Sequence, residues 1–187
     1  MPTDAEIRAS VEHIVSAAED SLMVLTKRRL TGEIDTLAWR SAVQAELRSA
    51  HMAATALAHG GLGNLTAAER GWAGSRLRSE YSHLASFGLD LATGDLSDAQ
   101  VLARAQLYAH SVYGTHEEAR RRVAKGQGFD QERNILGAAQ HCTQCPGMTA
   151  KGWVPMGTLP APGSRACLGR CRCRLEYRVA PASEAAA

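Results

Sequence analysis

The sequence predicts a mainly α-helical protein, a bundle of about four long helices followed by a small C-terminal cysteine-rich β-hairpin module. Apolar residues recur every three or four positions in four stretches before Gly126, and capping motifs precede three of these stretches. Alanine is abundant while aromatic residues make up only 5% of the chain, which favours closely packed helices. All five cysteines fall between Cys142 and Cys173.

The first two helices have clear limits in the sequence. A capping box, Thr3-x-x-Glu6, opens the first helix, which we expect to end near Thr31-Gly32. The second is expected to run from about Asp35 to the Gly60-Gly61 pair, since glycine suits a helix end. Their inward stripes are Ile7, Val11, Ile14, Ala18, Leu22 and Leu25 in the first helix, and Trp39, Val43, Leu47, Ala50, Ala54 and Leu57 in the second.

The third and fourth helices also begin at capping boxes, Thr66-x-x-Glu69 and Ser97-x-x-Gln100. The fourth is expected to continue past Gly114, where it could kink. The inward positions are Leu77, Tyr81, Leu84, Gly88 and Leu91 in the third helix, and Val101, Ala105, Tyr108 and Val112 in the fourth.

Gly126-Gln127-Gly128 interrupts the helical pattern and is the best boundary inside the chain. We therefore expect a helical domain over residues 1–126, a cysteine-rich module over 127–179 and a flexible tail over 180–187. A short helix, roughly Gln131 to Ala139, should lead into the first cysteine pair. Residues 146–163 carry four prolines and four glycines, which predicts turns and short extended pieces.

The cysteine spacing predicts a metal site. Cys142-x2-Cys145 lets two thiolates at a turn face one ion, and a later pair completes the tetrahedral shell that Zn²⁺ favours. Cys171 and Cys173 are two residues apart, so in a strand both sulfurs project from the same face. We expect one Zn²⁺ in a zinc-binding β-hairpin module, with Trp153 packed over the hairpin.

Five thiols for four positions leave one over. The metal-ligand candidates are Cys142, Cys145, Cys167, Cys171 and Cys173. The favoured four are Cys142, Cys145, Cys171 and Cys173. Cys167 is the spare or substitute, and His141 is a weaker candidate. Disulfides suit secreted chains with an even cysteine count, whereas this count is odd and residues 1–10 do not resemble an export signal. A redox pair would need a βαβ setting, which the surrounding glycines and prolines do not supply.

The formal net charge is only +2, yet the two ends of the chain differ. From Arg120 onward there are eleven Lys/Arg against four Asp/Glu, or +7, while the preceding residues hold ten against fifteen, or −5. Such a basic segment could face nucleic acid, so a zinc-stabilised nucleic-acid-binding module is one alternative. Neutralising a thiolate-bound metal is a second role for the arginines, and stabilising the end of a helix is a third.

No catalytic constellation can be assembled from the sequence. Gly60 to Gly63 lacks the ending of a phosphate-binding loop, and Arg120 stands where a zinc hydrolase motif starting at His116 would need its second histidine. No run approaches the roughly 20 apolar residues of a membrane span. We expect a protein that is not an enzyme and has no membrane partner.

The C-terminal motifs resemble a known family. Cys142-x2-Cys145, the stretch from Gly152-Trp153 to Leu159-Pro160, Gly163 and Cys167-x3-Cys171-Arg172-Cys173 resemble the C-terminal end of phage minor head proteins, the Mu F-like head-morphogenesis family, in a short form common in prophages. The helical part, with Gly60-Gly61-Leu62-Gly63 and the segment from Leu102 to Tyr108, looks similar too.

This resemblance implies a low-copy structural component that acts in capsid assembly near the portal. Its expected partners are the portal protein and the major capsid protein, with packaged DNA as a further contact. Its expected location is the virion, and the host cytoplasm during assembly.

Overall fold

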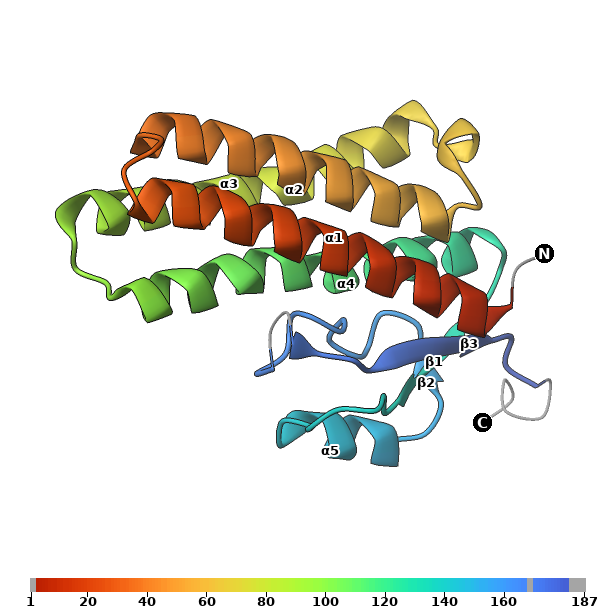
Figure 1. The fold of residues 1–187 in the computed structure, drawn as a ribbon. Coiled ribbons are helices and arrows are strands. Elements are labelled where there is room, and N and C mark those ends of the chain that lie inside the picture. The colour runs from red at the N-terminus through yellow and green to blue at the C-terminus, as the bar shows by residue number, and fades with distance from the viewer. Residues whose placement is uncertain (1–2, 168–169, 182–187) are drawn as a thin grey trace.

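The computed structural model describes residues 3–167 and 170–181, and four long helices lie beside a small sheet (Figure 1). The fold is mainly α, as the sequence predicts. The helices are α1 (Asp4–Leu30), α2 (Thr36–Ala58), α3 (Ala67–Thr93) and α4 (Asp98–Gly126), and a short 3₁₀ helix, η1 (Leu62–Asn64), links α2 to α3. None of the described helices is long and apolar enough to cross a lipid bilayer.

The helices begin where the capping motifs place them. In the three capping boxes the Ser or Thr side chain accepts a hydrogen bond from the backbone three residues on, and the Glu or Gln side chain accepts one in return. Asp35 caps α2 by accepting the Ala38 N–H at 2.7 Å. Gly94 ends α3 with a φ of 76°, a conformation that glycine adopts without steric cost. Helix α4 continues unbroken through Gly114.

Aromatic side chains join the helices in the core. Trp39 on α2 meets Phe87 on α3 edge-on at 5.3 Å between ring centroids, and Phe87 stacks on Tyr108 of α4 at 6.0 Å. The Trp39 ring nitrogen donates to Thr26 of α1 at 3.3 Å, so all four helices meet here. Helix α3 packs mainly against α2, while α1, α2 and α4 pack against one another.

The C-terminal part forms a three-stranded antiparallel sheet in the order β2-β1-β3. Its elements are β1 (Gln131–Ile135), α5 (Gln144–Ala150), β2 (Val154–Pro155) and β3 (Arg174–Arg178). The central strand pairs Glu132 with Val154 on one side and with Tyr177 on the other. Strand β3 packs against α4. Figure 1 shows α5 on the side of the sheet away from the long helices. The expected hairpin is therefore a small sheet.

The helix expected over residues 131–139 is wrong, because residues 131–135 form strand β1. The buried positions of this strand are Glu132 and Asn134, so its inward face is polar and shows no apolar alternation. Part of the segment expected to form turns and short extended pieces is helix α5. Its first turn accommodates Pro146 because early helical N–H groups need no partner within the helix. Of the tail expected over 180–187, residues 182–187 lie outside the described part of the chain.

Candidate metal centre

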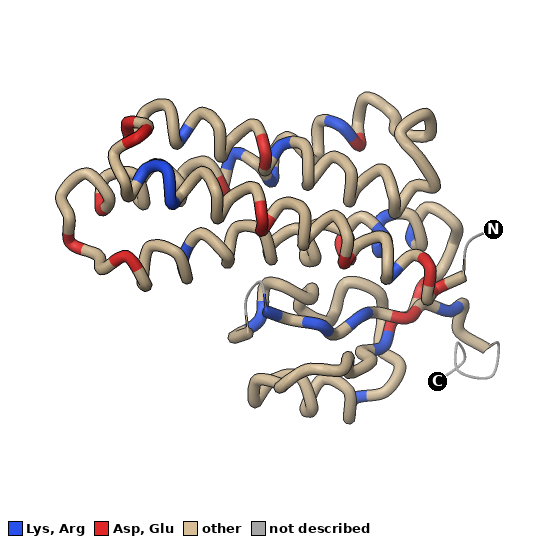
Figure 2. The backbone as a smooth tube through the Cα atoms, viewed as in Figure 1, with Lys and Arg blue, Asp and Glu red and all other residues tan. Residues whose placement is uncertain are grey.

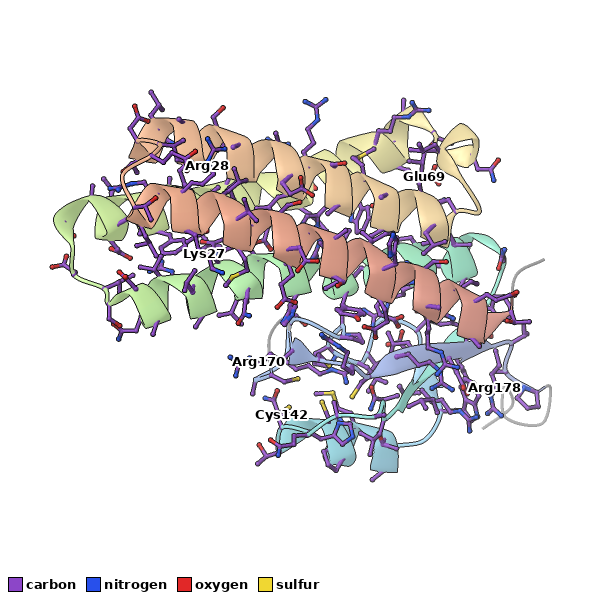
Figure 3. All side chains as sticks on the ribbon, in the orientation of Figure 1. Lys27, Arg28, Glu69, Cys142, Arg170 and Arg178 are labelled. Atoms are coloured by element: carbon purple, nitrogen blue, oxygen red, sulfur yellow. The ribbon has the colours of Figure 1, made fainter. Side chains whose placement is uncertain are left out.

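Four separate segments bring the five cysteines together. Cys142 lies in the loop after β1, and Cys145 lies in the first turn of α5. Cys167 comes from the loop that follows β2, and Cys171 and Cys173 lie just before β3. Figure 3 shows sulfur atoms gathered beside Cys142, between α5 and the segment that leads into β3. The strand starts at Arg174, so Cys171 and Cys173 lie just before it and not within it as the sequence suggested, yet both belong to the cluster.

The sulfur spacing suits a shared cation. Cys145 Sγ lies 3.4 Å from Cys142 Sγ and 3.8 Å from Cys167 Sγ. A tetrahedral ion bound at about 2.3 Å by thiolates places its sulfurs about 3.8 Å apart. Cys145, Cys171 and Cys173 form a second group whose sulfurs also lie within 4.8 Å of one another. The cysteine cluster can therefore hold a metal ion.

Cys167, expected as the spare or substitute ligand, lies close to two other thiols. It belongs to the group of Cys142 and Cys145, while Cys171 and Cys173 form the other group with Cys145. His141 lies at the edge of the cluster, and its Nδ1 is 3.8 Å from Cys173 Sγ. All five cysteines are free thiols, so each sulfur is open to a metal and none is held in a disulfide.

A buried arginine closes one side of the cluster. Arg165 is 2% exposed, and its Nη1 donates to Cys145 Sγ at 3.7 Å and to Asn134 Oδ1 at 2.6 Å. Asn134 in turn donates to Thr149 Oγ1 at 2.7 Å. Because a buried guanidinium needs an anion nearby, this placement favours a negatively charged cluster. No sequence motif distinguishes Arg165. Its Nε donates to the carbonyl of Pro160, five residues earlier in the chain.

The thiols of the cluster differ in their pKa values. Hydrogen bonding from Cys173 lowers the pKa of Cys171 to about 4, and the same contact raises the pKa of Cys173. Burial raises the pKa of Cys142, but hydrogen bonds from the Cys145 side chain and backbone outweigh it and bring the pKa to about 7. Burial raises the pKa of Cys167. A bound cation would replace the shared protons and hold every ligand as a thiolate.

Gly137 lets the loop before Cys142 approach the segment before β3. A Cβ at this position would lie 1.9 Å from the Arg172 carbonyl oxygen, so only glycine fits there. The neighbouring Leu136 packs against the cysteines. Trp153, which we expected over the hairpin, lies against β1 and β3: Arg133 and Arg178 are 4.7 and 4.6 Å from its ring centroid. Its side chain is not among those packed against the cysteines.

Two buried carboxylates dock this module onto α4. Glu117 Oε2 accepts the Leu175 N–H of β3 at 2.9 Å. Glu132 on β1 is fully buried, accepts the Leu159 N–H at 2.9 Å and pairs with Arg121 of α4 at 2.9 Å. Figure 2 shows acidic and basic positions crowded together where the ends of the helices meet the sheet. The cysteine-rich module therefore rests on the helical part through hydrogen-bonded charges.

Most of the C-terminal arginines have internal partners. Arg133 and Arg174 both pair with Glu176, at 2.7 and 3.0 Å. Arg172 lies over the Tyr113 ring at 3.9 Å. Arg170 is exposed, and Figure 3 shows it pointing away from the module. Ion pairs and ring contacts within the protein therefore explain the positions of more of these arginines than a nucleic-acid-binding surface would.

Two buried helical histidines also have structural partners. His51 is buried between α2 and α4, with Nδ1 2.7 Å from Thr115 Oγ1 and Nε2 3.3 Å from Ser111 Oγ. Ser111 donates its proton to the Tyr108 carbonyl at 2.8 Å, so its hydroxyl is not poised as a nucleophile toward His51. His116 contacts the Ala54 carbonyl at 3.1 Å.

Fold and site together define a helical protein with a small cysteine-rich module that can bind metal. No protein-family model, curated protein or solved structure matches this chain.

Proposed function

We propose that this chain is a non-enzymatic phage minor head protein that acts in capsid assembly near the portal, with zinc bound in its cysteine cluster as a structural site. The zinc proposal rests on five thiols that form two overlapping groups, each with its sulfurs within 4.8 Å of one another, beside a buried arginine. The head-assembly proposal rests on the residues that resemble the minor head family, from Cys142-x2-Cys145 through Gly152-Trp153 to Cys171-Arg172-Cys173.

Zinc suits this ligand set because thiolates are soft ligands and Zn²⁺ has no geometric demand beyond the tetrahedron that they favour. A segment of about 50 residues with many prolines and glycines buries too little apolar area to fold unaided. A structural zinc can supply on the order of 10 kcal/mol of folding free energy. The metal would thus hold the sheet and α5 in the shape that docks onto α4.

In this proposal the helical part meets the portal protein or the major capsid protein, and the zinc module fixes the geometry of one contact. A small module locked by a metal and by Glu117 and Glu132 presents its surface in one orientation. Rigid presentation favours assembly because fewer side chains and loops have to be ordered upon binding. The protein would then be found in the virion at low copy number.

Metal analysis tests the zinc site. Protein purified under reducing conditions should contain zinc, and a chelator should unfold the module while leaving most of the helical circular dichroism. The double variant Cys142→Ser, Cys145→Ser should lose the metal, whereas Ser164→Ala, on an exposed residue of the same module, should keep it. Metal-free protein with stability unchanged by chelator would contradict the zinc proposal.

Deletion in an inducible prophage tests the assembly role. Loss of the gene should give defective or non-infectious heads, and the same double cysteine variant should reproduce much of that loss. Ser164→Ala serves as the matched control. Heads that package DNA and infect normally without the protein would rule out the assembly role.

A further inference from the structure

Over residues 3–167 and 170–181, Arg165 is the one buried lysine or arginine, with 2% of its surface exposed. A buried guanidinium is costly unless an anion lies beside it. None of the ion pairs in this part of the chain involves Arg165. Its charge is therefore balanced by a group other than a carboxylate.

The hydrogen bonds of Arg165 identify that group. Its Nε donates to the Pro160 carbonyl at 3.0 Å, and its Nη1 donates to Asn134 Oδ1 at 2.6 Å and to Cys145 Sγ at 3.7 Å. The two oxygens are neutral acceptors, so among these three contacts only the Cys145 sulfur can carry a full negative charge. The second terminal nitrogen, Nη2, is buried and has no hydrogen-bond partner among the described residues. The guanidinium thus lacks negative charge, which metal-bound thiolates would bring.

We propose that Arg165 is a positioning residue of the metal site, which balances the charge of the metal-bound thiolates at Cys145 and fixes the direction of that sulfur. A Zn²⁺ ion leaves a charge of about −1 with three thiolates and about −2 with four, so a buried cation beside them stabilises the occupied site. The inference rests on the proposed zinc binding and adds to it a residue that is not itself a metal ligand.

Cys145 is held at both its sulfur and its backbone by one hydrogen-bond network. Thr149 Oγ1 donates to the Cys145 carbonyl at 3.2 Å and accepts from Asn134 Nδ2 at 2.7 Å. The same Asn134 side chain receives the Arg165 guanidinium that contacts the sulfur. Cys145 belongs to both groups of cysteines, so the direction of its sulfur affects the whole cluster. Partners that orient metal ligands in this way typically contribute about 10- to 100-fold in metal affinity.

The geometry of these contacts suits arginine better than lysine. The planar guanidinium reaches the Pro160 carbonyl through Nε, and it reaches Asn134 and Cys145 through Nη1. A lysine ammonium carries the same charge as a compact group on a flexible stem and cannot reproduce this fork of donors. Lysine at position 165 should therefore keep the charge balance and lose part of the positioning.

The test measures the zinc affinity of the reduced full chain by competition with a chelator of known affinity. Arg165→Met should bind Zn²⁺ about 10- to 100-fold more weakly than wild type, and Arg165→Lys should lose less. Arg170→Met, at an exposed arginine of the same module, should bind like wild type. Equal affinities of wild type and Arg165→Met, or equal losses in the Met and Lys variants, would overturn this inference alone. A wild-type chain that binds no zinc would overturn the zinc proposal as well.

A spectroscopic readout separates positioning from general loosening of the module. In protein loaded with ¹¹³Cd, Arg165→Lys should shift the cadmium resonance, because the hydrogen bond to a metal-bound sulfur changes. Trp153→Ala removes a side chain of the same module that is not packed against the cysteines, so it should leave the resonance in place. An unmoved resonance in Arg165→Lys, or a shift of the same size in Trp153→Ala, would overturn the positioning role.

Discussion

Glu117 on α4 holds Leu175 on β3 through a hydrogen bond of 2.9 Å from the Leu175 N–H to its carboxylate. The same carboxylate receives Arg120 at 3.3 Å. Burial raises the pKa of Glu117, although Arg120 and the Leu175 N–H act in the opposite direction. Because Leu175 lies two residues after Cys173, this bond ties the helical part directly to the cysteine cluster.

Replacing Glu117 with Ala should destabilise the protein by about 2 kcal/mol, because it leaves the buried Leu175 N–H without a partner. Urea denaturation measures the loss, and hydrogen exchange at the Leu175 amide should become faster. The control is Glu118→Ala, the next residue, whose ion pair with Arg76 is partly exposed and should contribute less than about 1 kcal/mol. Equal effects of the two substitutions would contradict the docking role of Glu117.

A second contact depends on two glycines that let the loop of the module touch α4. Gly163 has a φ of 91°, and a Cβ there would lie 2.9 Å from the Gly114 Cα. We expect Gly163→Ala to cost roughly 1 to 3 kcal/mol in thermal or urea unfolding, through backbone strain and steric overlap.

The control for Gly163→Ala is a glycine-to-alanine substitution on an open helical surface. A methyl group added at Gly71 on α3 would meet no atom within 4 Å, so Gly71→Ala should stabilise the protein by about 0.5 to 1 kcal/mol. A neutral Gly163→Ala would show that the loop can move away from α4 at no cost.

Trp153 should stabilise the sheet without holding the metal, in contrast to the expectation from its place between the cysteine pairs. Its ring contacts Arg133 of β1 and Arg178 of β3. Trp153→Ala should therefore cost about 2 kcal/mol in unfolding experiments, from lost packing and cation–π contacts, and the zinc content should stay unchanged. Release of zinc from this variant would restore the original expectation.

Acid should destabilise the helical part through His51. Burial lowers the pKa of His51 from 6.5 to about 4, so between these values the unfolded chain binds a proton that the folded chain does not. The contribution of neutral His51 to the free energy of unfolding is thus complete above pH 6.5, and it decreases as the pH is lowered to about 4. One such group accounts for about 2 kcal/mol between about pH 7 and pH 5.

The check compares unfolding free energies at about pH 7 and pH 5 for variants and wild type. His51→Gln should reduce the difference between the two pH values by about 2 kcal/mol, whatever it does to stability at neutral pH. His13→Gln, on an exposed residue, should leave the difference as in the wild type. A His51→Gln protein with the wild-type pH dependence would show that other groups cause the acid sensitivity.

The helices and the cysteine cluster could be predicted from the sequence because their signals are local. A capping box joins residues three apart, as Thr3 and Glu6 show, and the predicted starts of the four long helices agree with the structure to within about a residue. Thiols are scarce and chemically distinctive, so their spacing alone indicated a common site in which all five now lie.

The tertiary structure alone decided how the cysteines group and how the module is held. Strand β1 escaped prediction because its inward residues, Glu132 and Asn134, are polar, and they can be buried only where Arg121 and Arg165 meet them. These partners lie 11 and 31 residues away, and Glu117 reaches 58 residues to Leu175. A buried polar group is stable only when its partner is present, and the sequence does not say which distant residue the fold will bring to it.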